Sequence, residues 1–234
     1  MPHLDHRKVI AIDGPAAAGK TTVARELADS LGILLFDTGA LYRCITLKAI
    51  RKGADLEDEK ALAKIARKAK IKLKPASVED GRAADVLLDG EDVTWSIRQP
   101  EVDANVSKVA AYATVREALL SVQRENADGS AVVMVGRDIG TVVTPNAGTK
   151  IYLDATAEER ARRRYQDMRR QGESMDYISV LDELRERDFK DSTRLVAPLK
   201  AADDAIRIKT DGLAVDEIVG QIERIVLERW AKLS

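Results

Sequence analysis

Residues 9–22 read VIAIDGPAAAGKTT, and this stretch decides the fold. Val9–Ile12 has the apolar pattern of a buried strand, and a helical pattern begins near Lys20. Between them lies the spacing G-x-x-x-x-G-K-[ST], whose glycines let a loop wrap so closely that its N–H groups point at phosphate oxygens. The strand, loop and helix together predict a nucleoside triphosphate site.

The loop supplies both a cation and a metal ligand for such a site. Lys20 can bridge the β- and γ-phosphates, and the hydroxyl of Thr21 can bind Mg²⁺. A plain glycine turn is the alternative, but chance matches in a chain of this length number on the order of 0.01. The residues expected to bind the nucleotide are Gly14, Pro15, Ala16, Ala17, Ala18, Gly19, Lys20, Thr21 and Thr22.

Outward from this loop, short apolar runs alternate with longer helical patterns. The rhythm predicts an α/β fold of the P-loop NTPase type, a parallel five-stranded sheet flanked by helices. Glycines at 32 and 53 end two helices, Thr156–Glu159 is a capping-box pattern, and a last helix runs from about Val215 to Trp230. The further strands are expected at Ile33–Phe36, Ala131–Val135, Lys150–Leu153 and Ala205–Lys209.

One stretch breaks the rhythm. Residues 70–93 resemble short antiparallel strands with a turn at Asp89-Gly90, so we expect an inserted subdomain over residues 55–100 of a single domain, 1–234. The alternative is a long segment on the surface that has no function. Gly172–Met175 separates two charged helical segments and is predicted to be the hinge or tip of a short lid, residues 160–190.

Composition excludes several classes of function. The 38 Lys and Arg nearly balance 39 Asp and Glu, aromatic residues make up 4%, and no basic run is interleaved with stacking side chains, so we expect no nucleic-acid partner. No apolar run approaches about 18 residues, and the start Met1–Lys8 lacks the apolar stretch of a signal peptide. We therefore expect no membrane partner and a cytoplasmic monomer.

Two residue types are too scarce for common catalytic sites. Cys44 is the one cysteine, which excludes an intrachain disulfide and indicates a packing role. The two histidines, His3 and His6, precede the first strand, so histidine-based triads and zinc sites are not expected. Carboxylates, lysine, arginine, hydroxyls and backbone amides remain, and this set suits anionic substrates.

Polar residues follow the second and third predicted strands. Carboxyl ends of parallel strands share one edge of a sheet, so Thr38, Arg43, Arg137 and Asp138 are expected to face the same crevice as the loop. Each has a plainer alternative. Thr38 could cap a helix, Arg43 could be a solvated helix residue, and Arg137-Asp138 could be an ion pair that orders a loop.

Two later arginine groups have helical spacing. Arg187, Asp191 and Arg194 would share one helix face and could hold an anion beside a hydroxyl, although solvated charges are the alternative. Arg160 and Arg164 also share a face, where an anion between them would relieve their repulsion. In the alternative, Arg163 of that helix pairs with Glu159 and Asp167.

Taken in order, several blocks resemble the bacterial cytidylate kinases, nucleoside monophosphate kinases of the P-loop class, over nearly the whole chain. The matching segments are Ile12–Pro15 with Gly19-Lys20, Asp37–Arg43, Val115–Leu119, Gly136–Val143, Glu186–Asp188 and Ala197–Leu199.

The resemblance implies a role for each matching position. Arg160 and Arg164 at the start of the lid would act with Lys20 in catalysis, and the insertion would be the monophosphate-binding subdomain. Asp191, oriented by Arg187, would take the ribose hydroxyls. The cytosine would be surrounded by Thr38, Ser107, Arg116 and Asp138, and the monophosphate held by Arg43, Arg137 and Arg194. Serine is as common as threonine at position 38, and Thr21 fills a position where some members have glycine.

The residues and the resemblance indicate phosphoryl transfer from ATP, with Mg²⁺, to CMP or dCMP. The acceptor phosphate is already anionic and needs no general base, which agrees with the scarcity of histidine. A kinase for another nucleotide or a hydroxyl metabolite is the first alternative, with Asp37 or Asp138 as base. A nucleotide-dependent switch with little turnover is the second.

Overall fold

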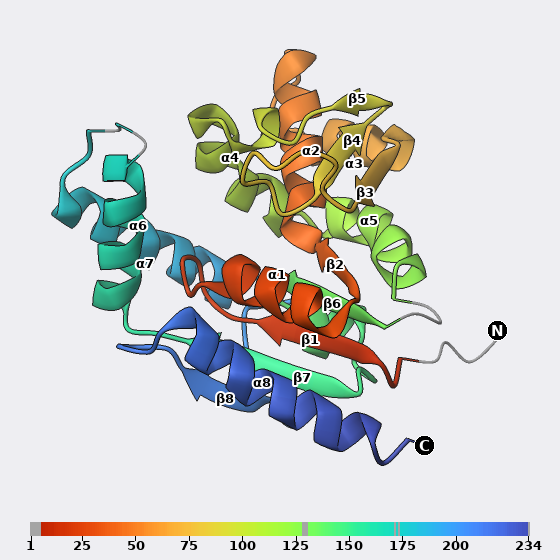
Figure 1. Cartoon of the computed structure of the whole chain (residues 1–234). Coiled ribbons are helices and arrows are strands. Elements are labelled where there is room, and N and C mark those ends of the chain that lie inside the picture. The colour runs from red at the N-terminus through yellow and green to blue at the C-terminus, as the bar shows by residue number, and fades with distance from the viewer. Residues whose placement is uncertain (1–5, 128–130, 171, 173, 234) are drawn as a thin grey trace.

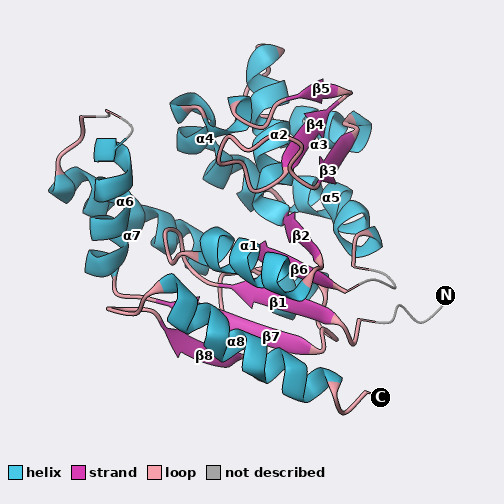
Figure 2. Ribbon diagram, in the orientation of Figure 1, coloured by secondary structure: helices cyan, strands magenta, loops and turns pink. Residues whose placement is uncertain are grey.

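A computed structural model describes residues 6–127, 131–170, 172 and 174–233. Its centre is a five-stranded sheet in the order β2-β6-β1-β7-β8 (Figures 1 and 2). Every neighbouring pair is parallel, as predicted from the sequence. The strands are β1 Val9–Asp13, β2 Leu34–Asp37, β6 Val132–Gly136, β7 Thr149–Asp154 and β8 Ile206–Lys209.

Alternating side chains of the central strands divide the core between the two faces of the sheet. Ile10 and Ile12 of β1 pack toward α1 (Lys20–Leu31) and α8 (Val215–Trp230), which lie side by side on one face (Figure 1). Val9 and Ala11 point the other way, into a separate apolar cluster on the opposite face. Such burial on both faces requires apolar residues at successive positions of β1, as observed from Val9 to Ile12; Asp13, at the carboxyl end, is the polar exception.

The opposite face is covered by α2 (Thr38–Arg51), α3 (Glu59–Lys68), α4 (Pro100–Ala111) and α5 (Ala113–Glu125). The predicted insertion contains a separate antiparallel sheet, β3-β4-β5, at Ile71–Lys74, Asp85–Leu88 and Glu91–Asp92. Asp89 and Gly90 both have positive φ, 53° and 95°, as the predicted tight turn between β4 and β5 requires. A 3₁₀ turn, η1 (Ser96–Arg98), leads into α4.

The helix ends follow the predicted signals with one exception. Gly32 ends α1 in the left-handed conformation, φ 64°. The capping box before α6 (Ala157–Arg170) is only half formed: the Thr156 hydroxyl accepts from Glu159 N at 3.3 Å, but Thr156 N donates to Asp211. The Glu159 carboxylate instead accepts hydrogen bonds from two arginines of its own helix, Arg162 and Arg163.

A helical hairpin forms the remaining part of the structure. Helix α6 packs against α7 (Tyr177–Thr193), and both contact Ala16 of the phosphate loop through a small apolar cluster. The predicted hinge falls between these helices, but Glu173, like His3 near the start, lies outside the described residues. In the described part of the chain, no helix combines the length and the apolar character needed to cross a membrane.

Candidate active site

The carboxyl ends of the parallel strands bring the predicted residues to one edge. The phosphate loop follows β1, Asp37 ends β2, and Arg137 follows β6, which lies between β1 and β2. Asp13, at the end of β1, accepts hydrogen bonds from Ile139 N and Gly140 N, both at 2.8 Å. This buried carboxyl therefore ties the loop that carries Arg137 to the strand that carries the phosphate loop.

The phosphate loop has the backbone geometry that its glycines predict. Gly14 has φ 151°, and a Cβ there would lie 2.1 Å from the carbonyl oxygen of Leu153, a distance no side chain tolerates. Gly19 has φ 81° immediately before α1. The N–H groups at the start of α1 lack an intrahelical partner, so the helix end and the loop form a site for an anion.

Lys20 is the first residue of α1 and is 7% exposed, with Nζ donating to the carbonyl oxygen of Pro15 in the phosphate loop at 2.5 Å. Burial lowers the pKa of this amine well below its ordinary value, and the positive charges of Arg137 and Arg187 lower it further. A phosphate group bound here would offset the unfavourable contact between the amine and these two arginines, so the site suits an anion.

Thr21 lies beside a carboxylate that could share a metal ion with it. Its hydroxyl donates to Asp37 Oδ2 at 3.3 Å, while Asp37 Oδ1 accepts from Gly39 N and caps α2. The sequence suggested Asp37 as a possible base, not as a metal ligand. The described residues contain no group of three or more His, Cys, Asp or Glu placed to hold a metal. Two protein oxygens fit Mg²⁺ provided that phosphates and water complete its shell.

The residues that the resemblance assigns to the base line a cavity of about 90 Å³ between β6, α2 and α4. Arg116 forms a buried ion pair with Asp138, donates to the carbonyl oxygen of Ala110 at 3.1 Å, and lies 5.2 Å from the ring centre of Tyr42. Tyr42 was not singled out from the sequence, since an aromatic residue on a helix is usually core. The cavity is also lined by Thr38, Ser107, Arg187, Asp191 and Arg194.

The plainer alternatives for Thr38 and for the Arg137-Asp138 pair fail. Thr38 does not cap α2, because Asp37 does; the Thr38 hydroxyl donates instead to the carbonyl oxygen of Val135 at 2.8 Å. Arg137 and Asp138 do not form a pair with each other. Asp138 pairs with Arg116, and Arg137 Nε donates to Asp191 at 2.9 Å.

The third group differs in detail from the expected arrangement. Arg187 and Asp191 lie on α7, but Arg194 follows its last residue; its guanidinium is 3.6 Å from Asp138 and 3.9 Å from Asp191. Arg137, rather than Arg187, holds Asp191. Arg187 lies 3.8 Å from the carboxylate of Asp103. The buried Nε of Arg187 has no hydrogen-bond partner in the described structure.

The two lid arginines have different environments. Arg160 is 4% exposed, donates to the carbonyl oxygen of Ala16 at 3.1 Å, and pairs with Asp188 at 2.6 Å, which links α6 to the phosphate loop and α7. Arg164 is 42% exposed and pairs with Asp103 at 2.9 Å. Opposite charges thus offset the repulsion between these arginines. Arg163 pairs with Glu159, as the alternative expected, whereas Asp167 pairs with Arg170.

The phosphate loop opens on a second cavity of about 640 Å³, large enough for a nucleotide's phosphates and sugar. Its wall includes Lys20 and Thr21 and reaches Arg43, Arg137 and Arg187. These three arginines also line the smaller cavity described above, so one cluster of cations separates the two. Two anionic ligands could therefore meet across it.

Known proteins match this chain along almost its entire length. A family model described as cytidylate kinase covers residues 10–228. A cytidylate kinase of Desulforamulus reducens is 50% identical over 219 residues, covering 94% of this chain and 96% of the relative. Those of Herpetosiphon aurantiacus and Bacillus velezensis are 49% and 45% identical, over 89% and 97% of this chain and 90% and 99% of their own lengths. This agreement in sequence, together with the phosphate loop and the smaller cavity beside it, shows that the chain belongs to the cytidylate kinase family.

Proposed function

We propose that the protein transfers the γ-phosphoryl group of ATP to CMP or dCMP, giving ADP and CDP or dCDP. The observation that carries this proposal is the pair of cavities joined by arginines. The larger one, the donor cavity, contains the phosphate loop. The smaller one, the acceptor cavity, contains a buried Arg116–Asp138 pair suited to a polar base. A nucleotide-dependent switch has no need of a second phosphate site.

Catalysis in this site is positioning combined with charge neutralisation. The acceptor oxygen of a nucleoside monophosphate is already ionised, so no residue has to remove a proton. Lys20 and the loop N–H groups hold the donor, while Arg43, Arg137 and Arg194 hold the acceptor phosphate in line with it. Arg164 approaches the transferring group. An arginine in that position can contribute a factor of about 10³ to 10⁵ in rate.

Mg²⁺ would bind at Thr21, with Asp37 beside it, and would neutralise negative charge on the donor phosphates when bound. Arg160 has a supporting part in this conformation, because it holds the carbonyl group of Ala16 in the phosphate loop.

Base selection rests on Asp138, which is 5% exposed and has a fixed partner on one side. Its carboxylate can accept from the exocyclic amine of cytosine, and Arg116 and Thr38 face the ring acceptors. Asp191 is placed for the sugar hydroxyls. Uracil has a carbonyl oxygen where cytosine has the amine, and a carboxylate facing that oxygen is unfavourable.

Two moving parts complete the proposal. Residues 55–100 would form the monophosphate-binding subdomain, and residues 160–190 the lid. Closure of both over the cavities would exclude water, since ATP would otherwise be hydrolysed instead of transferring its phosphoryl group to the acceptor.

The test is ADP production measured with CMP, dCMP, UMP and AMP in parallel, with and without Mg²⁺. We expect turnover with CMP and dCMP, a weaker response to UMP, little to AMP, and loss of activity when Mg²⁺ is chelated. Lys20→Ala is the matched inactive control. Equal rates with every acceptor, or wild-type rates in the Lys20 variant, would contradict the proposal.

A further inference from the structure

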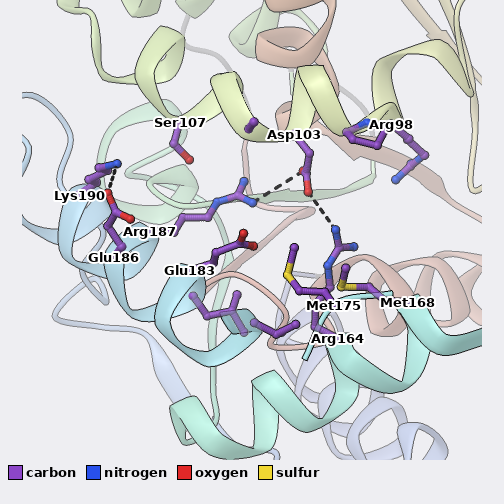
Figure 3. A pocket seen from close by; sticks show the side chains of 14 residues that line it. Arg98, Asp103, Ser107, Arg164, Met168, Met175, Glu183, Glu186, Arg187 and Lys190 are labelled. Carbon is purple, nitrogen blue, oxygen red and sulfur yellow. Dashed lines mark hydrogen bonds and ion pairs between the residues drawn. The ribbon is translucent and has the colours of Figure 1, made fainter. Parts of the chain in front are cut away.

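The carboxylate of Asp103, on α4, contacts arginines from three different helices. Figure 3 shows two of them, Arg164 and Arg187. Arg43 of α2 donates to its Oδ1, Arg164 of α6 donates to its Oδ2 at 2.9 Å, and Arg187 of α7 lies 3.8 Å from Oδ1. One side chain of α4, just beyond the predicted insertion of residues 55–100, thus joins α2 to both helices of the hairpin.

Asp103 lies where the cavities meet. It lines the donor cavity and also an adjoining cleft of about 440 Å³ between α4 and the hairpin. Arg43 lines the donor and acceptor cavities, Arg164 lines the donor cavity and the cleft, and Arg187 lines all three. The carboxylate therefore occupies the junction toward which the phosphates of both substrates would point.

Asp103 carries a full negative charge at neutral pH. Its burial alone would raise the pKa of the carboxyl, but Arg43 and Arg187 outweigh that effect and hold the pKa below its ordinary value. Its side chain is 25% exposed, and that of Arg43 is 20% exposed. A guanidinium group engaged by a carboxylate has fewer N–H donors left for a phosphate, so Asp103 and a substrate phosphate compete for the same arginines.

We propose that Asp103 is an internal counter-anion that holds Arg43 and Arg164 while the acceptor is absent, and that the acceptor's phosphate displaces it. The inference rests on the proposed function, in which Arg43 binds the acceptor and Arg164 approaches the transferring group. Displacement frees Arg164 only once an acceptor has arrived. Asp103 is in these terms a positioning residue that acts through the arginines.

This arrangement slows the hydrolysis of ATP, in which the γ-phosphoryl group is transferred to water. In that side reaction the oxygen of water forms the new bond to the γ-phosphorus, the bond to the bridging oxygen breaks, and ADP and inorganic phosphate leave, with a proton released to solvent. With Arg164 held by Asp103, the stabilisation that this arginine gives to the transferring group is withheld.

Asp103→Asn tests the proposal, because it keeps the size of the side chain and removes its charge. Without competition from the carboxylate, CMP should bind about three- to tenfold more tightly in the absence of ATP, measured by calorimetry. Acceptor-independent ADP release should rise by a similar factor, and the rise should vanish when Arg164→Ala is added. Asp103→Glu, which restores the charge, should reverse both effects.

Glu186→Gln is the matched control, since Glu186 lines the same cleft but pairs with Lys190 at 2.5 Å. It should leave CMP affinity and ATP hydrolysis unchanged. Asp103→Ser provides a second neutral side chain, and thermal melting confirms that each variant is folded.

The proposal is overturned if folded Asp103→Asn and Asp103→Ser bind CMP no more tightly than the wild type, or more weakly, as a purely bracing role would require. An unchanged rate of ATP hydrolysis in both variants would contradict the proposal that Asp103 keeps Arg164 away from the transferring phosphoryl group. A wild-type protein that makes no ADP with CMP would instead contradict the proposed function.

Discussion

Replacing Asp138 with Asn should reduce the preference for CMP over UMP by about 10- to 150-fold. Asn keeps one oxygen for the hydrogen bond from Arg116 but places an NH₂ group where the carboxylate would accept from cytosine. A hydrogen bond to a charged group contributes about 1.5 to 3 kcal/mol, and each 1.4 kcal/mol is a factor of ten. The reaction with UMP is not weakened, because the carbonyl oxygen of uracil can accept a hydrogen bond from the new amide.

The assay is kcat/KM for CMP and for UMP, measured by coupled ADP release at saturating ATP. Removing a buried charge partner also costs stability, so the urea midpoint must confirm that the variant is folded. Asp204→Asn is the matched control: Asp204 pairs with the largely buried Lys150 at 2.9 Å, and neither lines the acceptor cavity described above. A folded Asp138→Asn variant with an unchanged CMP/UMP ratio would refute the base-reading role.

Three further predictions concern the phosphate loop and its support. Lys20→Met should lower kcat by on the order of 10² to 10³ in steady-state ADP formation, through loss of charge stabilisation; a smaller effect on kcat than on KM would contradict this role. Gly14→Ala should lower the melting temperature and weaken ATP binding, because its Cβ would lie 2.1 Å from Leu153 O; wild-type values for both would refute the steric argument. Burial raises the pKa of Asp13 to about 6, so between about pH 4 and 6 the native carboxyl keeps a proton that the unfolded chain has lost. Its contribution to the free energy of unfolding is therefore greatest below pH 4 and falls by about 3 kcal/mol as pH rises through 6. The Asp13→Asn side chain does not titrate, so the free energy of unfolding of this variant, measured in urea, should rise relative to that of the wild type between pH 5 and 7.5. A difference between the two proteins that does not change with pH would exclude this effect.

The features predicted from the sequence are those encoded locally. The phosphate loop, the five strands and the Asp89-Gly90 turn each depend on residues within a few positions of one another. Backbone sterics and apolar periodicity act over that range, so the pattern carries the structure. Resemblance to a family added residues without any local signal, of which Arg116 is the clearest.

Partners across the fold were predicted less well. Arg137 pairs with Asp191 rather than with its neighbour Asp138, and Arg194 acts from beyond the end of its helix. Asp211 takes the hydrogen bond expected of Glu159 in the capping box. For Arg137 and for Thr156, a partner 54 or 55 positions away competes successfully with a local one, and spacing along the chain does not report such competition.

The sequence by itself determined the class of fold, the donor site and the family, because these follow from short motifs and their order. The tertiary structure decided which arginines meet which carboxylates. Inserting β6 between β1 and β2 brings Asp138 beside Arg116, and the packing of α4 against α2 and α7 carries Asp103 into the arginine cluster. The physical reason is that electrostatic pairing depends on distance in space, and the order of strands sets that distance.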